Sequence, residues 1–125
     1  MIKRRILSAG ERKSIYNMFN GHCAYCGCEI TLYNMQVDHI APLYNGGADE
    51  LSNMFPACRS CNHRKHTLSV ESFRQEIEKA PERLMRDSPT YRNAVRFGLV
   101  VHPETPKVVF YFEKVERQTT HENST

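Results

Sequence analysis

Apolar residues recur at helical spacing in three stretches of the chain, which predicts three helices. The first covers residues 8–19, where Ser8 stands at the position of an N-cap. The second covers residues 70–79 and continues past a proline through residue 85. The third begins at Ser88 and ends before Gly98, because serine and glycine favour these boundaries. We expect each apolar face to pack into the core.

Short apolar runs outside these helices predict strands. The strand candidates are residues 29–33, 35–41, 99–101 and 108–112. The last two are expected to pair as a short β-hairpin within residues 99–115, and residues 49–53 are expected to form a helical turn. Residues 116–125 are polar and show no periodicity, so we expect a disordered tail there. Helices and short strands together predict an α+β fold.

The length of 125 residues suits one domain, which we place at residues 1–115. No apolar run is long enough to span a membrane, so we expect no membrane partner. The N-terminus is basic, but no apolar segment of signal-peptide length follows it. We therefore expect a cytoplasmic protein.

Cysteine spacing changes this picture, because four of the five cysteines form two C-x2-C pairs. Cys23 with Cys26 and Cys58 with Cys61 give the pattern C-x2-C-x31-C-x2-C. Two such turns can place four thiolates around one structural zinc ion, which would stabilise a small domain. Cys28 falls outside the pairs and is expected to be an ordinary thiol.

The segment between the cysteine pairs holds residues suited to catalysis. Asp38 is a hard oxygen ligand for Mg²⁺ or Mn²⁺, and His39 has a side chain that can take a proton from water near neutral pH. Asn62 follows the last cysteine and offers an amide oxygen. Asn53 also lies in this segment. Taken one at a time, each of the four residues has an ordinary structural interpretation: Asp38 as a turn cap, His39 as a core histidine, Asn53 as a turn residue and Asn62 as a helix cap.

The net charge of +3 is mild, but the basic residues are unevenly distributed. The stretch 58–67 carries Arg59, Arg64 and Lys65 and no acidic residue. Such a patch suits the binding of phosphates, which would position a nucleic acid without reading its sequence.

The order and spacing of these motifs resemble the HNH endonucleases of the ββα-metal class. The similar motifs are Cys23-x2-Cys26-Gly27, Val37-Asp38-His39-Ile40-x-Pro42-Leu43, Gly46-Gly47, Leu51-x-Asn53 and Cys58-Arg59-x-Cys61-Asn62-x2-Lys65. The resemblance implies a zinc-stapled ββα-metal core at residues 22–67, a helical extension at residues 69–98 and the hairpin after it. Softer likenesses in the C-terminal part imply a phage or bacterial origin.

The resemblance also implies a role for each site residue. His39 is the general base, Asp38 and Asn62 hold the catalytic divalent metal, and Asn53 orients the base and its loop. Many family members carry histidine where this chain has Asn62. His66, four residues later, is a second candidate for this position, and His63 is a third.

The function expected from the sequence is metal-dependent hydrolysis of DNA phosphodiester bonds, with double-stranded DNA as the partner and RNA kept open. The cofactors expected are structural Zn²⁺ and catalytic Mg²⁺ or Mn²⁺, and the protein is expected to be a monomer or a weak dimer. One alternative is a zinc-stabilised module that binds nucleic acid without cutting it. Another is an interaction protein with a decayed site.

Overall fold

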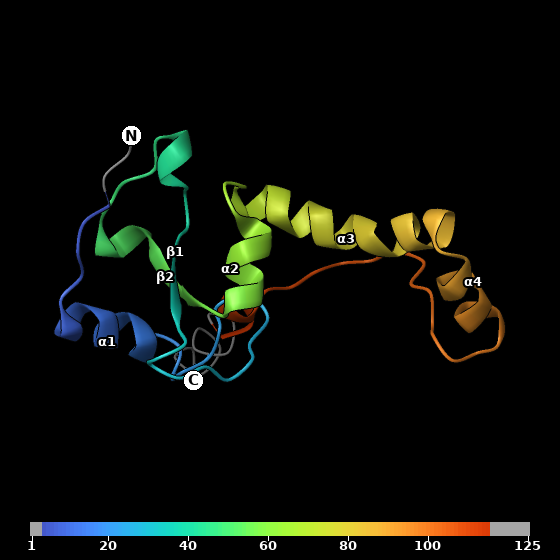
Figure 1. Cartoon of the computed structure of the whole chain (residues 1–125), viewed down its shortest axis with the longest axis horizontal. Coiled ribbons are helices and arrows are strands. Elements are labelled where there is room, and N and C mark those ends of the chain that lie inside the picture. The colour runs from blue at the N-terminus through green and yellow to red at the C-terminus, as the bar shows by residue number, and fades with distance from the viewer. Residues whose placement is uncertain (1–3, 116–125) are drawn as a thin grey trace, which may run out of the picture. The chain divides into compact units, whose positions relative to one another are not determined.

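The computed structural model describes residues 4–115 (Figure 1). Its elements in chain order are α1 (Ala9–Asn17), β1 (Gln36–His39), η1 (Leu43–Asn45), η2 (Leu51–Asn53), β2 (Met54–Ala57), α2 (Arg59–Lys65), α3 (Val70–Asp87) and α4 (Pro89–Arg96). The chain forms two compact units. Of the described residues, 4–70 and 109–115 make the first unit, and 71–108 make the second. That residues 1–115 act as one domain stays a prediction.

The first unit is built around a two-stranded antiparallel sheet. β1 and β2 pair with Gln36 opposite Ala57 and His39 opposite Met54. α1 packs on β2, and α2 packs on β1. Ile15 of α1 and Met54 of β2 meet Ile30 and Met35, which lie in the segment before β1, in the core of this unit. This core fixes β1, so the end of the strand carries Asp38 and His39 into the site described below.

The expected helices are confirmed. α1 begins with a capping box, in which the Ser8 hydroxyl accepts from the Glu11 amide and the Glu11 carboxylate accepts from the Ser8 amide. The second helix runs without a break past Pro81, and the third begins at Ser88, whose hydroxyl accepts from the Tyr91 amide. The helical turn predicted at residues 49–53 is the short helix η2.

The predicted strands are only partly confirmed. Residues 36–39 are extended, but their partner is residues 54–57 and not the candidate at 29–33. In that candidate, Thr31 and Asn34 close a tight turn by exchanging side-chain hydrogen bonds with each other's amides. β2 went unpredicted because it contains Pro56, and proline usually argues against a strand.

The C-terminal β-hairpin predicted at residues 99–115 is wrong. Residues 99–110 contain no strand, and residues 111–115 are helical. The amides of Tyr111 and Phe112 donate instead to the carbonyls of Tyr25 and Ala24, so this segment closes on the first cysteine pair. The tail predicted at residues 116–125 lies outside the described residues.

The second unit consists of α3, α4 and the segment that follows them. Arg92 donates to the carbonyls of Met85 and Arg86 and so joins the start of α4 to the end of α3. Arg74 and Glu78 of α3 bind the backbone carbonyl and amide of Val108. None of the helices described here has the length and apolar character needed to cross a membrane.

Candidate active site and metal centre

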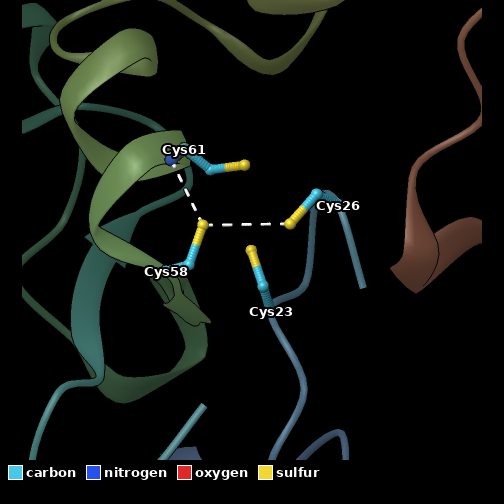
Figure 2. A group of neighbouring side chains, drawn as sticks. All are labelled: Cys23, Cys26, Cys58 and Cys61. Carbon is cyan, nitrogen blue, oxygen red and sulfur yellow. Dashed lines mark hydrogen bonds between the residues drawn. The ribbon is translucent and has the colours of Figure 1, made fainter. Parts of the chain in front are cut away.

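Four cysteine thiols converge at one point of the first unit. Figure 2 shows Cys23 and Cys26 on the first knuckle facing Cys58 and Cys61 at the start of α2. Their four sulfur atoms lie within 4.8 Å of one another, and the sulfurs of Cys26 and Cys58 are 3.8 Å apart. In a tetrahedral zinc–thiolate site the sulfurs are about 3.8 Å apart, given a metal–sulfur distance of ~2.3 Å. The group therefore fits one tetrahedral metal ion.

Backbone amides point at these sulfurs, as they do in metal-binding knuckles. The amide of Tyr25 donates to Cys23 Sγ at 3.4 Å, and the amide of Cys61 donates to Cys58 Sγ at 3.3 Å. A hydrogen bond between Cys61 and Cys23 lowers the pKa of the Cys23 thiol and raises that of the Cys61 thiol, while burial raises the pKa of the Cys58 thiol. The fifth cysteine, Cys28, is exposed and lies outside the four-sulfur group, although its thiol is in side-chain hydrogen-bond contact with Cys26 and Cys58.

Asp38 is buried, with 4 % of its surface exposed, and lines the cavity described below. The Tyr25 hydroxyl donates to Asp38 Oδ2 at 2.5 Å, and Lys65 Nζ lies 3.2 Å from the same oxygen. Burial raises the pKa of the Asp38 carboxyl, while Tyr25 and Lys65 counter this rise. A carboxylate offers about four lone-pair positions, so these two partners leave Asp38 able to accept from a further ligand.

Lys65 corrects a prediction, because its side chain is completely buried. Its ammonium group donates to Asp38 Oδ1 at 3.3 Å and to the His39 carbonyl at 2.9 Å. An ammonium group in this position cannot contact a phosphate on the surface. Lys65 is therefore a structural partner of Asp38, whereas Arg59 and Arg64 are exposed as expected.

His39 ends β1, and its ring is held by Asp49. His39 Nε2 and Asp49 Oδ1 are 2.9 Å apart. This hydrogen bond, followed by one from the Arg5 backbone amide, lowers the pKa of the Asp49 carboxyl. Asp49 went unpredicted because it lies ten positions after His39 in the chain and no motif links the two.

Asn53 fixes the loop after β1. Its side-chain oxygen accepts from the Ala41 amide, and its side-chain nitrogen donates to the carbonyls of Ala41 and Ala48. At the loop's turn, a Cβ added to Gly47 would lie 1.8 Å from the Ala41 carbonyl oxygen, so only glycine fits there. The structure therefore brings Asn53 to the loop beside His39, where its hydrogen bonds are all to backbone.

Three of the four predicted catalytic residues, Asp38, His39 and Asn62, share one cavity of about 300 Å³, whereas Asn53 is not among the residues that line it in the described part of the chain. Asp38, His39, Asn62 and His66 all line it, together with Arg4. Asp38 and His39 are the last two residues of β1, and both line this cavity although neighbouring side chains on a strand alternate in direction. His63 is exposed and is not among the lining residues within the described part of the chain.

Tyr25 is the other residue that the sequence analysis missed. It lies between the cysteines of the first pair, and its hydroxyl reaches Asp38. Burial and then the charge of Asp38 raise the pKa of Tyr25, so the hydroxyl stays protonated and donates. No periodicity or motif marks this contact, since it joins residues that are distant along the chain.

Comparison with known proteins agrees with this geometry. Residues 23–68 match the family model described as HNH endonuclease. That range contains the four clustered cysteines and four of the cavity and loop residues described above, namely Asp38, His39, Asn53 and Asn62. The domain indicates nuclease activity on nucleic acids.

Two known proteins are similar over part of their sequences. The SPbeta prophage protein YoqL of Bacillus subtilis, whose name assigns it to the HNH endonucleases, is 35% identical over 78 residues. The match covers 54% of this chain and 34% of that protein. The CRISPR-associated endonuclease Cas9 of Corynebacterium diphtheriae is 40% identical over 47 residues, which are 37% of this chain and 4% of Cas9. The chain thus matches about a third of the first relative and a small part of the second.

A solved structure shares the fold. The crystal structure of the Type II-C Cas9 enzyme from Actinomyces naeslundii matches 85% of this chain and 14% of its own with a TM-score of 0.50. Its sequence identity is 20%, so the likeness concerns the fold alone.

Proposed function

We propose, from the premise that residues 23–68 form an HNH endonuclease domain, that this protein is a metal-dependent endonuclease that hydrolyses DNA phosphodiester bonds. The observation that carries the proposal is the meeting of Asp38, His39 and Asn62 at one cavity. A carboxylate, an imidazole and an amide oxygen beside one open space are the groups that a one-metal phosphodiesterase needs.

Two metals are part of the proposal. The four thiolates suit a structural Zn²⁺ ion, which would tie the first knuckle to α2. The oxygens of Asp38 and Asn62 suit a hard divalent ion, Mg²⁺ or Mn²⁺, and His66 is a further donor that lines the same cavity. When bound there, such an ion polarises the phosphate and stabilises charge on the departing oxygen.

His39 acts as the general base in this proposal. Its ring takes a proton from a water molecule, whose oxygen then bonds to the phosphorus as the bond to the 3′ oxygen breaks. The leaving oxygen takes a proton from solvent, which gives 5′-phosphate and 3′-hydroxyl ends. Asn53 serves this step indirectly, since its three hydrogen bonds to Ala41 and Ala48 hold the loop beside the base.

Arg59 and Arg64 are proposed to contact DNA phosphates on either side of the scissile bond. Both side chains are exposed, and both lie on α2, the element that carries Asn62. Phosphate contacts of this kind make binding weaker as salt rises and do not select a sequence.

The proposed function is tested by incubating the purified protein with supercoiled plasmid DNA and Mg²⁺, Mn²⁺ or EDTA. We expect nicking with a divalent ion and none with EDTA. The His39→Ala variant should lose at least about 100-fold in rate while keeping its zinc content, as expected for removal of a general base. His63→Ala is the matched control, because His63 lies outside the cavity.

Two outcomes would contradict the proposal. Cleavage by His39→Ala at the wild-type rate would remove His39 from the base role. Binding of DNA by the wild-type protein without cleavage under any metal condition would favour the non-catalytic zinc module instead. Parallel reactions with an RNA of the same sequence decide whether DNA is the preferred substrate.

A further inference from the structure

Asp49 forms a hydrogen-bonded link between the N-terminal segment and the candidate base. Its Oδ1 lies 2.9 Å from His39 Nε2, and its Oδ2 accepts from the Arg5 backbone amide at 2.5 Å. Both carboxylate oxygens are thus committed, one to the ring and one to the backbone. The Asp49 side chain is 24% exposed and the His39 side chain 9% exposed, so the link is only partly open to water.

A carboxylate can only accept hydrogen bonds, so Nε2 of a neutral His39 must carry the proton. The lone pair is then on Nδ1. Within the described residues, no hydrogen bond to Nδ1 is found. Every buried side-chain nitrogen and oxygen in this part of the chain has a hydrogen-bond partner, so Nδ1 is not one of the buried atoms. Nδ1 therefore reaches solvent, and the open space that His39 lines is the cavity it shares with Asp38 and Asn62.

We propose that Asp49 is the positioning residue of the site: it holds His39 in the Nε2–H tautomer and so directs the basic Nδ1 atom at the water to be activated. This inference rests on the proposed function, since it assigns a partner to the proposed base. Asp49 acts only through His39. A carboxylate that orients a histidine in this way serves catalysis by fixing both the ring position and the tautomer.

The backbone N–H of Arg5 makes the proposal testable, because it sets the orientation of an asparagine side chain introduced at position 49. In Asp49→Asn the backbone N–H of Arg5 needs an acceptor, so the amide oxygen turns to Arg5. The NH₂ group then faces His39 Nε2 and donates to it, which forces the proton onto Nδ1. The milder substitution therefore blocks the base, whereas in Asp49→Ala a water molecule can replace the carboxylate.

The experiment compares Asp49→Asn, Asp49→Ala and the control Glu50→Ala. Glu50 is the neighbouring acid, and it pairs with Arg5 at 3.7 Å without contacting His39. We expect Asp49→Ala to lower kcat about 10- to 100-fold with little change in KM, as for other residues that orient a site histidine. Asp49→Asn should lose about 10³-fold or more, as wrong-tautomer variants do. Glu50→Ala should match the wild type.

The tautomer itself is read by long-range ¹H–¹⁵N NMR correlations of the histidine rings at a pH where they are neutral, with the His39 signals assigned from His39→Ala. The wild type should show Nε2–H, and Asp49→Asn should show Nδ1–H. Zinc content and thermal melting confirm that each variant is folded.

A purely structural role for Asp49 predicts the opposite order, with the isosteric Asn variant milder than Ala. That order, or an unchanged tautomer in Asp49→Asn, would overturn the proposal. If both variants fail to fold, the wild-type spectrum still decides, since an Nδ1–H tautomer there is incompatible with it. If the wild type cuts no nucleic acid, the proposed function fails, while the NMR result still shows whether Asp49 sets the tautomer.

Discussion

At the scale of single residues, burial decides what a charged side chain can do. Lys65 lies on the same helix as Arg59 and Arg64, and its charge in the sequence looks the same as theirs. The structure separates them, because the ammonium group of Lys65 is enclosed and bonded to Asp38 and the His39 carbonyl, while both arginines are exposed. A buried ammonium group with such partners holds the site in place and adds nothing to contacts with a phosphate.

This difference predicts opposite effects for two neighbouring substitutions. Lys65→Met leaves the Asp38 carboxylate buried without its cation, which should lower the free energy of unfolding by about 3 kcal/mol or more. Arg64→Met should change it by less than about 0.5 kcal/mol but reduce the salt dependence of DNA binding. Urea unfolding and binding titrations at several salt concentrations measure both. An unchanged stability in Lys65→Met would contradict the structural role.

Some site residues could be predicted from neighbouring residues in the sequence, and others could not. Asp38 and His39 are adjacent within a motif, so the sequence predicted both as site residues. The structure brings both to one cavity. Tyr25 and Asp49 went unpredicted because each acts through one contact to a residue ten or more positions away. A single sequence carries no sign of such a contact, since neither residue type is unusual where it stands.

At the scale of elements, α2 joins the metal centre to the candidate active site. Cys58 caps the helix through its sulfur, Cys61 adds a second thiol one turn later, and Asn62 and His66 face the cavity. The helix is only seven residues long, too short to be stable alone in water. Its position therefore depends on what holds its first turn, and the thiolate group is the strongest candidate.

We accordingly expect Cys58→Ser to lose both zinc and the folded state. The serine hydroxyl can still cap the helix, so the loss would come from the metal site and not from the cap. Bound zinc is measured by elemental analysis and folding by circular dichroism. Cys28→Ser is the control for loss of one thiol: Cys28 is exposed and touches Cys26 and Cys58 but lies outside the four-sulfur group, so this variant should keep both zinc and fold. A zinc-free Cys58→Ser protein with native melting behaviour would contradict the expectation.

The helices could be predicted from the sequence, whereas only one strand, β1, was predicted and its partner was not, for a physical reason. Each helix is stabilised by hydrogen bonds and caps within a few residues, as at Ser8 and Ser88, so its signal is local. A strand needs a partner, and β1 pairs with β2 fifteen residues later, across the loop that carries Asp49. The predicted hairpin at residues 99–115 had apolar β-prone residues but no partner strand, and its amides pair with the first knuckle instead.

At the scale of the whole molecule, the chain leaves the first unit after Val70 and returns to it at Val109. The returning segment packs aromatic rings around Tyr25: the Phe110 ring lies 5.2 Å away and the Phe112 ring 6.2 Å away, both edge-on. Because Tyr25 lies between Cys23 and Cys26 of the four-sulfur group and donates to Asp38, this segment supports both the cysteine group and the candidate site. Residues far outside the range 23–68, which matches the HNH endonuclease family model, thus take part in the first unit.

Truncation of Phe110 tests this long-range support. The side chain is 2% exposed, so Phe110→Ala should lower the free energy of unfolding by about 3 kcal/mol or more through lost burial and a residual cavity. The matched control is Phe97→Ala, since Phe97 is 74% exposed and should change stability by less than about 0.5 kcal/mol. Both variants are compared by urea unfolding with zinc in excess, so that metal loss does not add to the result.

If the returning segment supports Tyr25, Phe110→Ala should also slow plasmid cleavage under conditions where the variant is fully folded, because the Tyr25 hydroxyl that donates to Asp38 is then held less firmly. Equal stability of the two variants would show that the first unit is stable without the packing of residues 109–115.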